Sequence, residues 1–88
     1  MREIEPRPIE VKALENYTLY IKFSNNEEKI LNISKLIKEN KIYEKLKNKD
    51  YFKVVKVSGC TIEWKNGEDI APEILYNKSI NINDFHRK

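Results

Sequence analysis

The acidic side chains of residues 57–76 are the first candidates for chemistry, because paired carboxylates can act as general acid and base or bind a hard cation. Four of them lie close together in the sequence: Glu63, Glu68, Asp69 and Glu73. We expect Glu63 and Asp69 on opposite faces of a hairpin, with Glu68 beside its turn. Glu73 suits the first turn of a helix. This spacing favours solvated or capping carboxylates, so neither a catalytic pair nor a metal site is predicted.

The chain has one histidine, His86, and one cysteine, Cys60. His86 lies two residues from the end of the sequence, where a fraying segment cannot hold a base within reach of a nucleophile. Cys60 follows Gly59 at the start of an expected strand, and we interpret it as a buried structural thiol. One thiol and one imidazole cannot complete a zinc site of Cys and His ligands, and one cysteine forms no internal disulfide. We therefore predict a protein that is not an enzyme and has no cofactor.

Lysines concentrate in residues 35–56, which hold eight of them against three acidic residues. Four recur at intervals of three, three and four: Lys35, Lys38, Lys41 and Lys45. On a continuous helix they would share one side, and with Tyr43 and Tyr51 nearby they could contact the phosphates of a nucleic acid. A solvated face is the favoured alternative, because Asn40 interrupts the helix and the sequence has no glycine-rich phosphate loop.

Length and composition describe the domain that must position these residues. A chain of 88 residues with 40% hydrophobic residues makes one small folded domain with a thin core, which excludes a large cofactor pocket. The N-terminus has no apolar segment and no stretch approaches 18 apolar residues, so export and membrane spanning are not expected. A net charge of +3 is mild for a dedicated nucleic-acid binder. We expect a cytoplasmic protein.

Apolar residues that alternate with polar ones predict a three-stranded antiparallel meander at the start of the chain. The strands are expected over residues 9–13, 18–23 and 28–33. Polar turns at 15–16 and 24–27 connect them.

The apolar period changes to that of a helix at Ser34, which we expect to be the N-cap of a helix ending near Asn40. A further helical turn or two follows over residues 42–46. Asp50 is the predicted cap of a short turn that carries residues 51–52.

A second hairpin is predicted after these helices, with strands over residues 54–57 and 60–64. Asn66-Gly67 is the preferred pair for a two-residue type I′ turn, in which both residues have positive φ. With that turn, Trp64 lies opposite Asp69 and its indole N–H can donate to the carboxylate. Trp64 then holds the hairpin to the last helix; a partner-binding hot spot is the alternative.

The last predicted helix begins at Pro72, whose fixed φ suits the first helical position. Residues 79–88 are interpreted as a tail or an edge strand. The predicted architecture is therefore one α+β domain over residues 1–78, in which an antiparallel meander and a hairpin pack against short helices, followed by the 79–88 tail.

The segment 61–76 resembles the signature of a bacterial family, the domain of unknown function 2442. Its pattern is Trp, any, Asn-Gly, any, Asp, aliphatic, Ala-Pro, acid, any, Leu-Tyr, carried here by Trp64, Asn66, Gly67, Asp69, Pro72, Glu73, Leu75 and Tyr76. The resemblance extends over residues 6–76. In two places the chain departs from it: Asn26-Glu27 occupy a turn where the family commonly has Gly, and Asn32 stands where Asp is frequent.

The resemblance implies a small α+β domain without an established activity. Some relatives carry a C-terminal helix-turn-helix domain, and others are encoded beside a small protein with which a toxin–antitoxin pairing has been proposed. The chain continues for about a dozen residues after the motif, and we expect no appended DNA-binding domain.

The predicted function is a protein-interaction module, the antitoxin-like or regulatory half of a two-protein pair, that binds another small protein through Trp64–Tyr76. The alternative is nucleic-acid binding through the lysine-rich residues 35–56. A membrane partner is not expected, and a homodimer through an exposed edge strand is left open.

Overall fold

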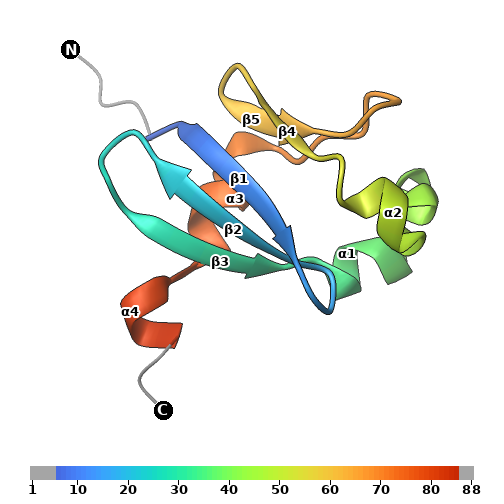
Figure 1. The fold of residues 1–88 in the computed structure, drawn as a ribbon, viewed down its shortest axis with the longest axis horizontal. Coiled ribbons are helices and arrows are strands. Elements are labelled where there is room, and N and C mark those ends of the chain that lie inside the picture. The colour runs from blue at the N-terminus through green and yellow to red at the C-terminus, as the bar shows by residue number, and fades with distance from the viewer. Residues whose placement is uncertain (1–5, 86–88) are drawn as a thin grey trace.

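The computed structural model describes residues 6–85. The expectations for residues 1–5 and for His86 lie outside this part of the chain. The chain forms a four-stranded antiparallel sheet in the order β1-β2-β3-β6 and a separate two-stranded hairpin β4–β5. Figure 1 shows β1, β2 and β3 side by side, with α1 and α2 at one end of the sheet, α3 behind it and α4 near the C-terminus. The predicted α+β class is confirmed.

The predicted meander forms from β1 (Pro8–Leu14), β2 (Thr18–Phe23) and β3 (Glu28–Asn32). β2 lies between β1 and β3 in the sheet. Its apolar residues alternate with polar ones, so Leu19, Ile21 and Phe23 are all fully buried on one face.

A β-bulge in β1 changes the expected burial of its first residues. Pro8 pairs with Phe23 and Glu10 pairs with Lys22, so Ile9 is the extra residue between them. A shift of one residue turns a side chain to the opposite face. Ile9 is therefore 49% exposed, while Pro8 is buried in its place.

Three short helical segments follow: α1 (Ser34–Glu39), the 3-10 helix η1 (Lys41–Lys47) and α2 (Lys49–Phe52). Neither predicted cap, Ser34 or Asp50, is the N-cap: Ile33 holds that position in α1, without a side-chain hydrogen bond, and Asn48 holds it in α2. The side chain of Asn32 accepts the Ser34 N–H at 3.0 Å, and that of Asn48 accepts the N–H groups of Asp50 and Tyr51. Asn48 is therefore the side-chain cap of α2, whereas Asn32 lies one residue before the N-cap of α1. In both places the short carbonyl group of asparagine reaches a backbone N–H two residues on.

The second hairpin consists of β4 (Lys56–Ser58) and β5 (Thr61–Glu63). Its loop is Gly59-Cys60, with a positive φ at Gly59 alone, as in a type II′ turn. The expected burial of Cys60 is wrong: the residue belongs to the turn and its thiol is exposed.

The C-terminal part contains α3 (Pro72–Asn77), β6 (Ile80–Asn81) and α4 (Ile82–Phe85). Of the two alternatives for residues 79–88, the edge strand is found for β6, which pairs with β3. The sheet therefore extends past the domain boundary predicted at residue 78.

The core lies between the inner face of the meander and the layer formed by α3 and the second hairpin, with the helical end closing one side (Figure 1). Its buried residues are Leu19, Ile21, Phe23, Leu31, Ile33, Ile37, Leu46, Phe52, Ile62, Trp64, Ile70 and Leu75. Within residues 6–85, none of the helices has the length and apolar character needed to cross a membrane.

Candidate functional site

The Asn66-Gly67 turn is a three-residue loop, and the predicted type I′ turn is wrong. Gly67 N–H donates to the Trp64 carbonyl at 3.0 Å, and Trp64 N–H donates to the Glu68 carbonyl at 2.9 Å. Gly67 has a φ of +96°, whereas Asn66 has no positive φ. This pattern is that of a type I turn followed by a left-handed residue. Trp64 consequently faces Glu68 and not Asp69.

The turn between β2 and β3 has the same form. Asn26 N–H donates to the Phe23 carbonyl and Phe23 N–H donates to the Glu27 carbonyl, both at 2.8 Å, and Asn26 has a φ of +73°. Asparagine tolerates the left-handed region that glycine adopts most readily. The turn therefore keeps its conformation although this chain has Asn26 where the family commonly has Gly.

Trp64 is 1% exposed, and its indole nitrogen donates to the Phe52 carbonyl at 2.9 Å. The predicted hydrogen bond to Asp69 is wrong. The ring also stacks on Phe52, with centroids 6.0 Å apart. Trp64 thus holds the hairpin to α2, and not to the last helix as expected.

The longer loop also brings Asp69 directly opposite Glu63, so the two carboxylates share one face of the strand pair. The expectation that they point to opposite faces is therefore wrong. Glu63 has an ion pair with Lys56 at 3.8 Å. Asp69 is exposed, and within the described chain its carboxylate accepts no hydrogen bond; only its backbone carbonyl does, from the Tyr43 hydroxyl at 2.9 Å.

The rest of the 64–76 motif separates into buried and exposed positions. Pro72 is the first residue of α3, as predicted, and Leu75 is fully buried in the core. Asn66 and Glu73 are exposed. The exposed carboxylates beside this segment, Asp69 and Glu73, together with the half-buried Glu63, are called the acidic rim below.

Tyr76 connects α3 to the meander. Its ring packs edge-on against Phe23 at 5.1 Å, and the Lys29 ammonium lies 3.8 Å from the ring centroid. Lys29 also donates to the Tyr76 carbonyl at 2.9 Å. The Tyr76 hydroxyl donates to Glu27, and this bond, with a second from Asn25, lowers the pKa of Glu27. Tyr76 is therefore engaged in the fold through its ring, hydroxyl and backbone.

Two tyrosines considered for nucleic-acid contact are engaged inside the chain. The Tyr51 hydroxyl donates to Glu68 at 2.6 Å and accepts the Asn66 N–H at 2.9 Å. Burial and the bond to Glu68 raise the pKa of Tyr51. Burial and the charge of Asp69 raise the pKa of Tyr43. Their hydroxyls thus already have partners in the turn and the rim.

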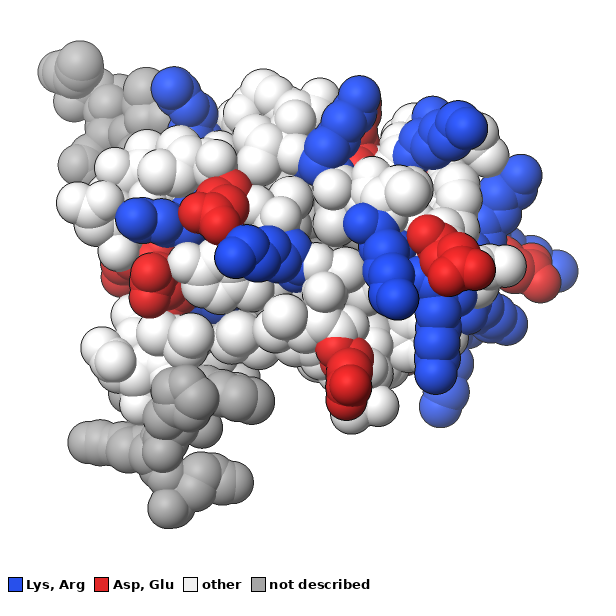
Figure 2. Space-filling model, in the orientation of Figure 1, with Lys and Arg blue, Asp and Glu red and all other residues white. Residues whose placement is uncertain are grey.

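The four spaced lysines do not lie on one continuous helix. Lys35 and Lys38 belong to α1, and Lys41 and Lys45 belong to η1. Asn40 separates the two segments with extended backbone, at φ −128° and ψ 117°. All four are exposed. The interruption expected at Asn40 is therefore confirmed. Figure 2 shows basic side chains gathered over the helical end of the molecule.

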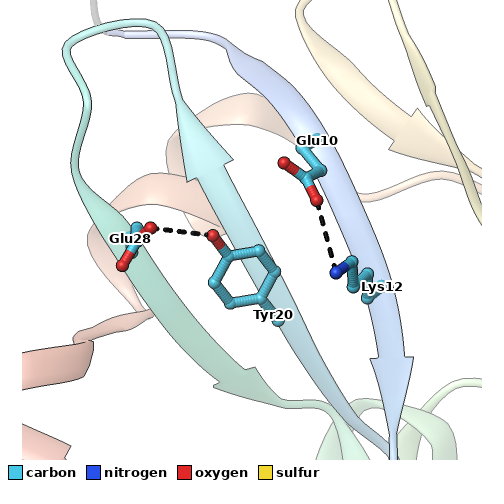
Figure 3. Close-up of polar contacts among 4 residues, drawn as sticks. All are labelled: Glu10, Lys12, Tyr20 and Glu28. Carbon is cyan, nitrogen blue, oxygen red and sulfur yellow. Dashed lines mark hydrogen bonds and ion pairs between the residues drawn. The ribbon is translucent and has the colours of Figure 1, made fainter.

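The outer face of the sheet carries a cluster of four polar residues that the sequence analysis did not predict: Glu10, Lys12, Tyr20 and Glu28 (Figure 3). The Tyr20 hydroxyl donates to Glu28 at 3.1 Å, and Lys12 pairs with Glu10 at 3.6 Å. Burial and the bond to Glu28 raise the pKa of Tyr20. The pairing of β1, β2 and β3 places these residues side by side, a register that the alternation of the three strands could have indicated. Each charge on this face has a neighbour of opposite sign or a hydroxyl.

No described cluster of three or more His, Cys, Asp or Glu side chains could hold a metal ion. No curated protein and no solved structure matches the chain. A family model matches residues 8–81, which include the meander, the helical end, the motif and β6. The chain therefore belongs to the family described as Protein of unknown function (DUF2442).

Proposed function

We propose that the protein is a non-enzymatic, cytoplasmic interaction module that binds another small protein through the acidic rim. The motif residues Trp64, Leu75 and Tyr76 pack within the domain, and Gly67 and Pro72 set its backbone. Asn66, Asp69 and Glu73 remain exposed beside them. Among these, Asp69 and Glu73 supply the charged side chains of the motif that a partner can reach.

The position of Asp69 opposite Glu63 is the observation that carries the proposal. Like charges directly opposite each other weaken a strand pair. Lys56 lies next to Glu63 on the far strand and offsets only that carboxylate. Among residues 6–85 the Asp69 carboxylate therefore has no contact that stabilises the fold, which supports a contact with a basic or hydrogen-bond-donating partner.

The resemblance to relatives that are encoded beside a small protein supports a narrower form of the proposal. In that form, the protein is the antitoxin-like or regulatory half of a two-protein pair. An acidic rim suits a basic partner surface, because opposite potentials speed encounter and select the partner.

The proposal is tested by capturing tagged protein and its partners from the host, with nuclease present. Asp69→Asn is compared with Glu39→Gln, which removes an exposed acid of α1 that is not part of the acidic rim. A stoichiometric protein that is kept by Glu39→Gln and lost by Asp69→Asn supports the acidic rim. Equal retention by both variants contradicts it.

Nucleic-acid binding by the lysine-rich residues 35–56 is the second candidate. It is favoured by the exposure of all eight lysines of this segment: Lys35, Lys38, Lys41, Lys45, Lys47, Lys49, Lys53 and Lys56. Phosphate contacts of this kind weaken steeply between about 50 and 200 mM salt. Absence of DNA and RNA retention at about 50 mM salt would dispose of this candidate.

A further inference from the structure

An open pocket of about 970 Å³ lies between the tip of the β1–β2 hairpin and α2. Its apolar part is formed by Ala13, Leu14 and Phe52, and Leu14 is 44% exposed. Lys49 and Lys53 lie on the α2 side. The pocket thus combines an apolar surface with two ammonium groups.

Tyr17 holds the two sides of the pocket together. Its hydroxyl donates to the Lys47 carbonyl at 2.6 Å, and its ring packs edge-on against Phe52 at 5.5 Å. Its carbonyl accepts the Ile33 N–H at 2.9 Å. These contacts maintain a φ of +55° at Tyr17, next to +58° at Asn16. A bulky residue is rarely left-handed, and such conformations persist where the surroundings enforce them, often at binding sites.

The charges around the pocket indicate the ligand. Lys49 and Lys53 are exposed, and neither has an acidic partner within ion-pair distance among residues 6–85. Glu15, on the hairpin side, repels a carboxylate at that end. An anionic group is therefore directed to the two lysines, and an aliphatic group to Leu14.

We propose that this pocket binds an acidic peptide segment of a partner protein, with an aliphatic side chain on Leu14 and a carboxylate between Lys49 and Lys53. A nucleic acid fits less well, because bases need an aromatic face for stacking. The Phe52 ring is 3% exposed, and the Tyr17 ring packs against it. The aliphatic surface of the pocket favours a peptide.

The test is an NMR titration of the whole protein with a blocked peptide of alternating leucine and glutamate, compared with its leucine–glutamine counterpart. Amide shifts should concentrate in residues 13–18 and 49–53. The glutamine peptide should bind about ten-fold more weakly or worse, because it lacks the charge that the lysines attract. The double variant Lys49→Glu/Lys53→Glu should lose binding to the same degree.

The matched control is Lys35→Glu/Lys38→Glu, which changes the net charge equally on α1 and should leave the affinity unchanged. Leu14→Ser provides a second variant that removes the apolar contact without altering charge, and it should also weaken binding. Absence of shifts at the pocket, or equal weakening by both lysine pairs, would overturn the proposal. Displacement of the peptide by a single-stranded oligonucleotide at the same residues would assign the pocket to nucleic acid instead.

This inference rests on the proposal that the domain binds proteins, but it uses a different surface. Asp69 does not line the pocket. The test of the acidic rim with Asp69→Asn and the test of the pocket with Lys49→Glu/Lys53→Glu therefore have independent outcomes.

Discussion

The indole nitrogen of Trp64 donates a hydrogen bond to the Phe52 carbonyl at 2.9 Å, and the two aromatic rings stack at 6.0 Å. This pair joins the second hairpin to α2 across the core. Trp64, the first residue of the family motif, therefore has a structural role. The exposed residues of the motif are the candidates for partner binding.

Trp64→Phe should lower the free energy of unfolding by about 1–3 kcal/mol, because the buried Phe52 carbonyl loses its donor. Urea unfolding followed by circular dichroism measures the change. Ile42→Ala, at a side chain that is 69% exposed, should stay within about 0.5 kcal/mol of the parent protein. An equal loss in the two variants would show that the hydrogen bond does not stabilise the fold.

Gly67→Ala should lower the free energy of unfolding by about 1–2 kcal/mol, the cost of a left-handed alanine. An added Cβ meets no atom within 4 Å, so backbone strain is the whole effect. Gly67→Asn should cost less, and Asn26→Gly should be neutral or stabilising, since both fit the shared loop geometry. If the Gly67→Ala and Gly67→Asn proteins lose the same free energy of unfolding, strain from a left-handed backbone at residue 67 is not the cause of the loss.

Stability should fall at alkaline pH as three half-buried tyrosines ionise. The folded-state pKa values of Tyr20, Tyr43 and Tyr51 are raised above the reference value of 10.0. A raised pKa contributes stability that is present below the reference value and is lost as the pH rises through the folded value. Ultraviolet absorbance titration of tyrosinate, together with thermal unfolding at each pH, measures both effects.

Asp69→Asn offers a specific check within that titration. The charge of Asp69 is the second cause of the raised pKa of Tyr43 and is not among the causes for Tyr51. The variant should therefore lower the pKa of Tyr43 and leave that of Tyr51 in place. A shift of Tyr51 alone would contradict the placement of Asp69 beside Tyr43.

The strands were predictable because each buries one face, so Leu19, Ile21 and Phe23 reveal β2 by their alternation alone. The turns were harder. The Asn66-Gly67 pair is compatible with either a two-residue or a three-residue loop. The three-residue loop is found, and in it the Asn66 N–H donates to the Tyr51 hydroxyl, a contact with α2 that the local sequence does not reveal.

That difference of one residue decided the candidate site. Asp69 lies opposite Glu63 and not opposite Trp64, so the predicted hydrogen bond between the Trp64 indole and the Asp69 carboxylate does not form. The pocket beside α2 was also missed, since it joins Leu14 to Lys49 and Lys53 through tertiary packing. The left-handed Tyr17 that holds it gave no signal in the sequence, because tyrosine is not a residue expected at a positive φ.

The most direct test of the central claim is the affinity of the captured partner protein for Asp69→Asn, measured by calorimetry beside Glu39→Gln and the parent chain. Since Asp69 is expected to serve the partner and not the fold, the affinity should fall about ten-fold or more. The free energy of unfolding should stay constant or rise by up to about 0.5 kcal/mol as the repulsion from Glu63 is removed. An unchanged affinity together with a less stable protein would contradict the account and make Asp69 a structural residue.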